Sequence, residues 1–523
     1  MLKETFNYFY KSFVFLLLAL GLSLTGMASA AFPGNTGIFY NVKDYGAGGN
    51  GDHLDTKAIN KTIAVAARAG GGTVYFPAGN YLTGSIHLQS NITLFIDQGA
   101  TIIAAPVKED SAAYDSPEPA INDQYQDFGH SHFHNSLIWG EKLHDISIIG
   151  SGMIWGKGLV RSGHKGDNQA NKSISLLLCR NVIIRDITIK HGGWFGILAT
   201  GVDNLTIDNV KMDTNRDGMD IDCCRNVRVS NCTVNSPFDD GICLKSSFAL
   251  GFARATENVT ITNCQVSGYD EGTLLDGTLK RSYSKYSHHS PTGRIKMGTE
   301  SNGGFKNITI TNCIFDYCRG LALETVDGGL LEDVTISNIT MRDITNAPFF
   351  IRLGGRMRAP DSMKVGECRR IILSNITVYN ADPRFGSIIS GIPGHDIEDL
   401  QLNNIRIYYQ GGGTKEMAQR KVPEYVKDYP EPDNFKPMPA YGFFIRHVNG
   451  LKLNNVQVSF MQQDQRPPFI LDQVKNASLD FVKGKTATRV PSLVLDSTEN
   501  ITLFRSFNVK DQILKRVTAH QIQ

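Results

Sequence analysis

Short strings of alternating apolar and polar residues recur through most of the chain. Most begin with Asn or Asp, as at Asn181, Asn204, Asn226, Asn258 and Asn307. Alternation with a period of two is typical of β-strands, and the strings are rich in β-branched residues. The closest strings are about 22 to 26 residues apart, a period typical of solenoid repeats. We therefore expect one strand-and-turn unit to recur along the chain.

A strand of a few residues cannot bury its apolar face alone, so successive units must stack on one another. Such stacking produces long parallel sheets. An Asn at the same turn of each coil can hydrogen-bond its neighbours and tolerates a left-handed backbone conformation. We predict an all-β protein that folds as a right-handed parallel β-helix. The alternative, a β-propeller, would need longer repeats with four strands each.

Two features depart from the repeat. Segment 55–79 has helical periodicity followed by glycines, and we expect a short helix there that covers the open edge of the first coil. Longer intervals between strings predict loop insertions near residues 105–140, 268–292, 345–367 and 410–445. Loops on one flank of a solenoid usually build its binding groove, so we expect the substrate on that flank.

The N-terminus has the features of a secretory signal peptide. Two lysines precede an apolar run over residues 13–24, and the small-residue pattern Ala28-Ser29-Ala30 follows. The run is short for a helix that spans a bilayer, which makes a membrane anchor the weaker alternative. We predict export to the periplasm or the extracellular space, with residues 1–30 removed and residues 31–523 forming a single catalytic domain without membrane contact.

The composition argues against a nucleic-acid-binding protein. The 523 residues are 41% hydrophobic and 20% charged with a formal net charge of +2, so we expect no basic surface suited to nucleic acid.

All nine cysteines follow the predicted signal peptide. Cys232, Cys264 and Cys313 each follow Asn in similar strings. We expect these three to stack as a buried file of small apolar residues rather than to form disulfides.

Two neighbouring strings carry an unusual number of acids. Asp217 lies in the first string, and Asp239 and Asp240 lie 22 residues after it in the second, which is about one coil. Residues one coil apart lie side by side, so we expect three neighbouring carboxylates. Repulsion between them would keep one acid protonated beside an ionised partner, as hydrolysis of a glycosidic bond requires. An Asp-rich turn or a Ca²⁺ site is the alternative.

The two acidic strings, "TNRDGMDID" and "PFDDGICLKS", together resemble the signature of glycoside hydrolase family 28, the polygalacturonases. The resemblance extends to "FYNVKDYGAGGNGDHLDTKAI" and "GSGMIWGKG" and so covers nearly the whole chain after residue 30. It implies a monomeric inverting hydrolase that cleaves galacturonic-acid bonds in pectic poly- or oligosaccharides without a cofactor or metal. It also implies that Asp240 is the general acid, with Asp217 and Asp239 positioning and activating the water.

The family pattern continues with a Gly-His-Gly segment that this chain lacks. The expected place falls near Thr292 and Gly293, and His288 and His289 lie just before it. His289 is therefore a candidate substitute that would contact the substrate. The alternative is a solvated loop histidine.

The Arg-Ile-Lys segment of the family pattern is also displaced. Ala322 and Glu324 stand in its expected coil, whereas Arg294-Ile295-Lys296 occurs one coil earlier. Basic side chains can bind a uronate carboxylate, and we expect Arg294, Lys296 and Glu324 to contact the substrate; ordinary surface charge is the alternative. These departures indicate a divergent subfamily, and a different linkage or neighbouring sugar would explain them.

Four further residues are weaker candidates for substrate binding: Lys245, Glu300, Arg352 and Trp194. Lys245 follows the acidic pair on its predicted strand, and Glu300 lies one coil further on. Arg352 begins a run of arginines that could reach an acidic sugar. Trp194 could stack on a sugar ring, although a tryptophan at the corner of a coil is more often a packing residue.

Two other functions fit parts of the pattern. A polysaccharide lyase on a similar β-helix would use the acids to bind Ca²⁺ and a basic residue to abstract a proton. A non-enzymatic adhesin or carbohydrate-binding protein would use the same solenoid without the stacked acids. Insertions near residues 105–140 and 410–445 would close an end of the binding groove, which favours exo action over endo action.

Overall fold

The computed structural model describes residues 39–106, 114–119, 122–162, 169–283 and 291–523. The predicted signal peptide and His289 lie outside these residues. Tyr40–Gln523 forms one compact unit, and of the other unit, Met1–Phe39, only Phe39 is described. No helix in the described part of the chain is both long enough and apolar enough to cross a membrane.

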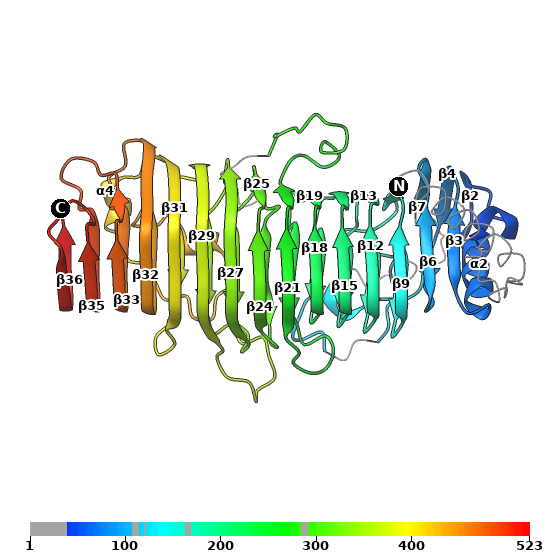
Figure 1. Ribbon diagram of the computed structural model, residues 1–523, viewed down its shortest axis with the longest axis horizontal. Coiled ribbons are helices and arrows are strands. Elements are labelled where there is room, and N and C mark those ends of the chain that lie inside the picture. The colour runs from blue at the N-terminus through cyan, green and yellow to red at the C-terminus, as the bar shows by residue number, and fades with distance from the viewer. Residues whose placement is uncertain (1–38, 107–113, 120–121, 163–168, 284–290) are drawn as a thin grey trace, which may run out of the picture. The chain divides into compact units, whose positions relative to one another are not determined.

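The unit Tyr40–Gln523 is a right-handed parallel β-helix, as the sequence predicts. Successive coils place their strands side by side, from the blue N-terminal coils to the red C-terminal coils in Figure 1. Each of the earlier coils contributes one strand to each of three parallel sheets. The strand pairs stay in register over their length, so equivalent residues of neighbouring coils lie next to each other.

The first sheet carries the candidate site. Its strands are β5 (Ile86–His87), β8 (Ile138–Glu141), β11 (Lys172–Leu177), β14 (Phe195–Thr200), β17 (Met219–Asp222), β20 (Ile242–Ser246), β23 (Ile295–Ser301), β26 (Leu321–Thr325), β28 (Phe349–Leu353) and β30 (Ser387–Ser390).

The second sheet follows the first within each coil. Its strands are β1 (Phe39–Asn41), β3 (Gly72–Phe76), β6 (Ile92–Ile96), β9 (His144–Ile149), β12 (Arg180–Arg185), β15 (Asp203–Asp208), β18 (Arg225–Ser230), β21 (Thr256–Thr262) and β24 (Phe305–Thr311).

The third sheet completes the coil. Its strands are β2 (Asn50–Leu54), β4 (Gly79–Thr83), β7 (Ala100–Ala104), β10 (Met153–Trp155), β13 (Thr188–Lys190), β16 (Lys211–Asp213), β19 (Thr233–Asn235), β22 (Gln265–Ser267) and β25 (Ile314–Asp316). Most later strands are longer and run through more than one sheet: β27 (Leu330–Arg342), β29 (Glu367–Ala381), β31 (Ile397–Gly411), β32 (Phe443–Gln462), β33 (Phe469–Asp480) and β35 (Leu493–Phe504). The last coils also contain the two-residue strand β34 (Lys483–Gly484) and the antiparallel final strand β36 (Gln512–Ile522).

Asparagines join the coils at one turn, as expected. The side-chain amide of Asn204 donates to Asn181 at 2.9 Å, and that of Asn226 donates to Asn204 at 3.1 Å. The ladder continues to Asn258 and Asn307. All five residues have φ between 54° and 58°, a left-handed conformation that Asn tolerates better than most residues.

The core consists of the side chains that point into the coil. Val227 and Val259 pair in register on neighbouring strands, and each is 1% exposed. All nine cysteines are buried free thiols. Cys232, Cys264 and Cys313 precede strands β19, β22 and β25, which pair with one another, so the predicted cysteine file is confirmed.

The short helices lie at the N-terminal end of the β-helix and in the loop insertions. Helix α2 (Thr56–Arg68) buries Ile59, Ile63 and Ala66 against the first coils, which confirms the predicted cap. The others are the 3₁₀ helix η1 (Val42–Tyr45) and the single-turn helices α3 (Phe128–Ser131), α4 (Lys415–Ala418) and α5 (Pro432–Phe435). Helix α3 lies in the insertion between β7 and β8, and helices α4 and α5 lie in the insertion between β31 and β32.

Candidate active site

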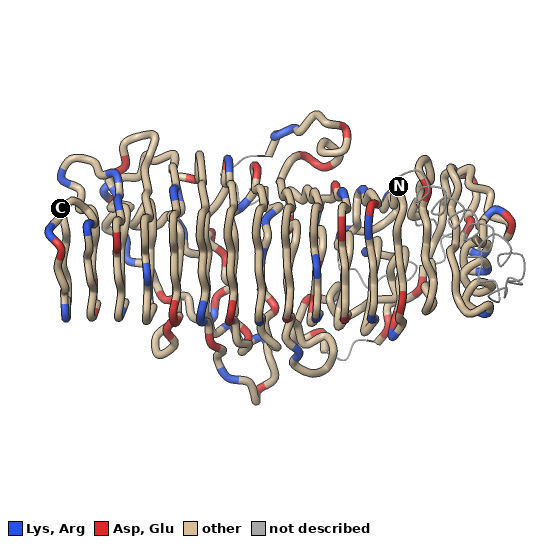
Figure 2. The backbone as a smooth tube through the Cα atoms, in the orientation of Figure 1, with Lys and Arg blue, Asp and Glu red and all other residues tan. Residues whose placement is uncertain are grey.

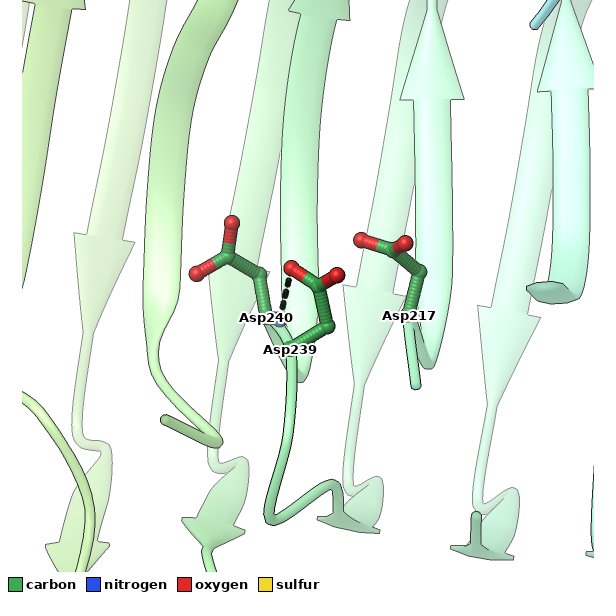
Figure 3. Close-up of side chains that lie close together, drawn as sticks. All are labelled: Asp217, Asp239 and Asp240. Atoms are coloured by element: carbon green, nitrogen blue, oxygen red, sulfur yellow. Dashed lines mark hydrogen bonds between the residues drawn. The ribbon is translucent and has the colours of Figure 1, made fainter. Parts of the chain in front are cut away.

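Three carboxylates meet at the turns that lead into β17 and β20. The Gly218 amide donates to the Asp240 carbonyl at 2.9 Å, which places Asp217 beside the acidic pair of the next coil. One oxygen of each carboxylate of Asp217, Asp239 and Asp240 lies within 4.8 Å of the others. Figure 3 shows Asp217 on one turn and the other two acids on its neighbour. The predicted juxtaposition of the three acids is therefore present.

The three acids differ in their exposure. Asp217 is 4% exposed and Asp240 is 3% exposed, whereas the Asp239 side chain retains 27% of its accessible surface. Asp239 accepts a hydrogen bond from the Asp240 amide at 3.0 Å and pairs with Arg216 at 2.6 Å. The cluster is thus buried except at the Asp239 side.

Their surroundings separate the protonation states of Asp217 and Asp240. Burial raises the pKa of Asp217 well above its ordinary value, and the charges of Asp239 and Asp220 add to this. Burial also opposes ionisation of Asp240, but Lys296, Arg294 and Lys245 outweigh it and hold the pKa of that carboxyl below its ordinary value. These opposite shifts favour the protonated form of Asp217 beside the ionised form of Asp240.

This arrangement differs from the role that the family resemblance implies for Asp240. The Arg294 Nε donates to one oxygen of Asp240 at 2.8 Å, and the Lys296 Nζ lies 3.4 Å from the other. Two cations in contact with one carboxylate keep it ionised. An ionised carboxylate can take a proton from water but has none to give to a leaving group. The free protein thus presents Asp240 as a base rather than as an acid.

The predicted Arg294 and Lys296 contact the site directly. Both side chains are 3% exposed and lie on the coil after the acidic pair. Arg294 bridges Asp240 and Glu431, and Lys296 lies between Asp240 and Glu324. The displaced Arg-Ile-Lys segment therefore supplies two cations to the acids.

Lys245 and Glu300 form a second charged pair beside the acids. Their charged groups are 2.9 Å apart, and Lys245 also lies 3.8 Å from Asp220 on the preceding coil. Arg356 approaches Glu300 at 3.7 Å and pairs with Asp327. Lys245 is 6% exposed and Glu300 is 4% exposed, so both lie at the floor of the site.

A divalent cation is a poor fit to this arrangement. The oxygens of Asp217, Asp239 and Asp240 are the donors that a cation would use. Both oxygens of Asp240 already face Arg294 or Lys296, and Asp239 already faces Arg216. Ca²⁺ needs six to eight oxygen ligands in total. Side-chain cations of the protein take the position that a metal would need.

The side chains of Glu324 and Trp194 are buried and have little surface open to a ligand. Glu324 is 0% exposed and accepts a hydrogen bond from Thr299, so it lies beneath the site and faces Lys296. Trp194 is 9% exposed because it stacks on Phe195 and lies under the Arg216 guanidinium. These two residues support the site from below and from one side.

Arg352, which we predicted to contact the substrate, is occupied by contacts within the protein. Arg352 is 2% exposed, and its guanidinium donates to Ser390 and to the carbonyls of Gly391, Glu424 and Tyr425. These acceptors lie on the next coil and on the insertion between β31 and β32. Arg352 therefore anchors that insertion. The sequence pattern places Arg352 on the outer face of the sheet but does not reveal that a loop covers it.

Three residues at the site come from insertions and carry no signal in the repeat pattern. His130 hydrogen-bonds to Asp220 at 2.9 Å, and Glu431 pairs with Arg294 and Arg319. Tyr429 is 51% exposed, and its hydroxyl can donate a hydrogen bond to the Thr299 oxygen, which lies 3.0 Å away. The sequence predicts the loops from their length but not where their side chains lie, because loops follow no periodic register.

Two family models match the chain. The model described as rhamnogalacturonase A/epimerase, pectate lyase-like, matches residues 39–136, and the model described as right handed beta helix region matches residues 124–279. The matches agree with the coils that the structure places there.

Two relatives carry names that denote polygalacturonase activity. The chain is 26% identical over 316 residues to a probable polygalacturonase of Vitis vinifera, which covers 55% of this chain and 61% of that protein. It is 23% identical over 410 residues to an exopolygalacturonase of Platanus acerifolia, covering 72% of this chain and 92% of that protein. The chain therefore spans about three-fifths of the first relative and nearly all of the second.

A solved structure shares the fold. The family 28 exopolygalacturonase of Yersinia enterocolitica superimposes with a TM-score of 0.62 at 18% sequence identity. The superposition covers 86% of this chain and 79% of that one.

Proposed function

We propose that this chain, a polygalacturonase-like protein of glycoside hydrolase family 28, hydrolyses glycosidic bonds to galacturonic acid in pectic polysaccharides or oligosaccharides. One observation carries the proposal: adjacent coils hold the carboxylates of Asp217, Asp239 and Asp240 together, where the pKa of Asp217 is raised and that of Asp240 is lowered. A proton donor beside an ionised carboxylate is the pair of groups that cleavage of a glycosidic bond needs. The names of the relatives point to the same substrate class.

The proposed reaction uses the two protonation states directly. Asp217 donates its proton to the glycosidic oxygen as the bond from that oxygen to the anomeric carbon breaks. A water molecule attacks the same carbon, and Asp240 takes the proton that this water loses. Asp239, between the two, orients the water through its partly exposed carboxylate. One product has a free hydroxyl where the glycosidic oxygen was, and the other has a new reducing end. The protons then redistribute through solvent.

Inversion at the anomeric carbon is part of the proposal. The carboxylate oxygens approach within 4.8 Å, closer than the carboxyl separation of about 6.5–9.5 Å that is typical of inverting glycosidases. Inversion is therefore carried by the family resemblance rather than by this spacing. Proton NMR of the first product formed tests it: inversion gives the anomer opposite to the substrate, and the same anomer would refute it.

Exo action is supported by what covers the first sheet on either side of the acids. On the N-terminal side the outer face is apolar and packs against the insertion between β7 and β8: Phe133, Trp194, Phe195 and Leu198. On the C-terminal side it packs against the insertion between β31 and β32: Ala322, Phe350, Ile388, Phe435, Met438 and Phe444. A long sugar chain cannot follow the sheet past either cluster, so we propose that the site takes a chain end.

A screen of defined pectic oligosaccharides tests this function and its alternatives. We expect new reducing ends without ultraviolet-absorbing unsaturated products, and monosaccharide or disaccharide release from the first time point. Unsaturated products abolished by a chelator would instead identify a lyase. Binding without any product would identify a carbohydrate-binding protein, and early products of intermediate length would refute exo action.

We also propose that the chain is exported. The proposal rests on the two lysines, the apolar run over residues 13–24 and the Ala28-Ser29-Ala30 pattern, and a pectic polymer is a substrate found outside the cell. Fractionation of cells that produce the full chain, with N-terminal sequencing of the product, tests it. We expect a mature N-terminus at Ala31 outside the cytoplasm, and an intact cytoplasmic chain would refute export.

A further inference from the structure

His130 reaches the outer face of the catalytic coil from an inserted loop. It lies on α3, in the insertion between β7 and β8, and is 3% exposed. Its Nε2 is 2.9 Å from Asp220 Oδ2, although the two residues are 90 positions apart in sequence. A buried contact between an inserted loop and this coil requires specific placement of the loop.

The surroundings of His130 are those of a reacting site rather than of a packing position. Asp220 lies on β17, just after the turn that carries Asp217, and its charge contributes to the raised pKa of Asp217. The Lys245 ammonium approaches the same Asp220 oxygen at 3.8 Å, and Lys245 pairs with Glu300. The edge of the His130 ring meets Phe195 at a centroid distance of 4.9 Å. The ring is therefore held between an aromatic wall and the acidic cluster.

Two buried polar atoms at this contact have no hydrogen-bond partner among the described residues. They are the second ring nitrogen of His130 and the second carboxylate oxygen of Asp220. Unpaired buried polar atoms are costly in a folded protein, so each calls for an explanation such as a catalytic role or a bound water. Both atoms lie beside the residues to which we assign proton transfer.

The family pattern expects a histidine near Thr292 and Gly293, on the coil after the acidic pair, and this chain has none there. The next residue, Arg294, binds Asp240 and Glu431. A histidine on this coil would compete with the guanidinium for the same space. His130 thus brings a histidine to the catalytic coil from a loop and not from a coil of the solenoid.

We propose that His130 is the histidine of the active site, a positioning residue that the insertion between β7 and β8 supplies and that acts on Asp217 through its hydrogen bond to Asp220. The ring fixes the Asp220 carboxylate, and the fixed charge of Asp220 keeps the neighbouring Asp217 in its proton-donating state. This role rests on the proposed hydrolase function. Through this one side chain, the insertion contributes to catalysis and not only to the wall of the binding surface.

Three variants separate the hydrogen bond from packing. In His130→Gln the side-chain amide can reach the position of Nε2, whereas His130→Asn is too short to do so. His130→Phe fills the ring space beside Phe195 without a donor. We expect His130→Gln to keep most of its kcat, and His130→Phe and His130→Asn to lose about 10- to 100-fold in kcat, the range typical of partners that orient a reacting group. KM should change less than kcat.

The control is His132→Gln on the same insertion. His132 is also 3% exposed, but its ring bonds to the Phe128 carbonyl at 2.9 Å, away from the acids of the catalytic coils. We expect its kcat to match that of the wild type. Wild-type kcat in folded His130→Phe, or equal rates in His130→Gln and His130→Asn, would overturn the proposal. No hydrolysis by the wild type on any pectic substrate would instead refute the proposed function.

Discussion

Asp217 and Asp240 are the same residue type, and their neighbours alone separate their chemistry. Asp217 faces Asp239 and Asp220, and it is buried. Asp240 is equally buried but faces Arg294 and Lys296. Like charges and burial favour the neutral acid, whereas opposite charges favour the anion. Adjacent turns of a β-helix therefore hold an acid and a base only a few ångströms apart.

The pH dependence of kcat reports the proton on Asp217. Activity should fall as pH rises through the raised pKa of Asp217, because the acid loses its proton there. The positive charge of Arg216 lowers that pKa. In Arg216→Gln this influence is lost and Asp239 loses its partner, so both changes raise the pKa of Asp217. We expect the high-pH limb of the kcat profile to move to higher pH.

The matched control for this measurement is Arg228→Gln. Arg228 belongs to the same coil but lies on β18, in the second sheet, where it is exposed. Its removal should leave the high-pH limb in place. An unchanged limb in Arg216→Gln, or a shift to lower pH, would contradict the assignment of the proton to Asp217.

Holding a proton on a buried carboxyl also costs stability. The pKa of Asp217 is raised in the folded state, so the unfolded chain ionises first as pH rises above the ordinary Asp value of about 3.9. The folded state is then progressively disfavoured until pH passes the raised pKa. Asp217→Asn removes this cost. We expect the variant to melt at a higher temperature than the wild type at pH 7 and to lose that advantage near pH 4.

Calorimetry at the two pH values checks this expectation. The variant should be inactive at both, because an amide cannot donate the proton. A lower melting temperature at pH 7 than that of the wild type would show that the Asp217 carboxyl stabilises the fold, which is the opposite of the effect expected for a buried acid with a raised pKa.

At the scale of elements, the coils supply the acids and the insertions complete their surroundings. Glu431, from the insertion between β31 and β32, pairs with Arg294 at 2.9 Å and with Arg319. Asp433 of the same loop lies 3.3 Å from Arg319. The loop is thus tied to the guanidinium that holds Asp240. A change in the loop should therefore affect Asp240 through one residue, Arg294.

We expect Glu431→Ala to loosen this loop and to lower kcat. Removal of one partner from a buried ion pair costs about 3–5 kcal/mol, because the remaining charge stays buried without compensation. Arg294 would also lose the contact that orients it toward Asp240. Limited proteolysis should cut between residues 412 and 441 faster than in the wild type, and kcat should fall in parallel.

Glu416→Ala provides the comparison. Glu416 lies on the same loop in α4, where its side chain is exposed, so its loss should change neither the protease sensitivity nor kcat. Equal protease resistance and equal kcat in Glu431→Ala would show that the loop does not depend on this ion pair.

At the scale of the molecule, the periodic part of the sequence predicts the structure well and the non-periodic part does not. The Asn ladder, the cysteine file and the stacking of Asp217 on Asp239 and Asp240 all follow from residues that recur at the same place in each coil. Equivalent strands of neighbouring coils pair in register even where a loop lengthens the interval between them. The paths of the insertions depend instead on packing over the whole first sheet, so the positions of His130 and Glu431 could not be predicted. For the same reason, the strand position of Arg352 is evident from the sequence, but the loop that covers it is not.

The charge distribution of the unit Tyr40–Gln523 agrees with this division of roles. Figure 2 shows acidic and basic residues interspersed along the coils and loops. Charges are thus not gathered into a broad field that would draw a polyanion to the surface as a whole. We therefore expect the proposed uronate substrate to be recognised at the site itself and not by the wider surface.

The rate of product release by Asp240→Asn tests the central claim most directly. The substrate is the pectic oligosaccharide that the wild type cleaves best, and Asp361→Asn, on an exposed loop residue, is the control. If Asp240 activates the attacking water beside Asp217, Asp240→Asn should still fold yet lose kcat by about 10²- to 10⁴-fold, as expected for loss of a general base, while Asp361→Asn keeps the wild-type rate. The melting temperature of Asp240→Asn should fall, because Arg294 and Lys296 lose a buried counter-charge. Equal rates for wild type and Asp240→Asn would contradict the account.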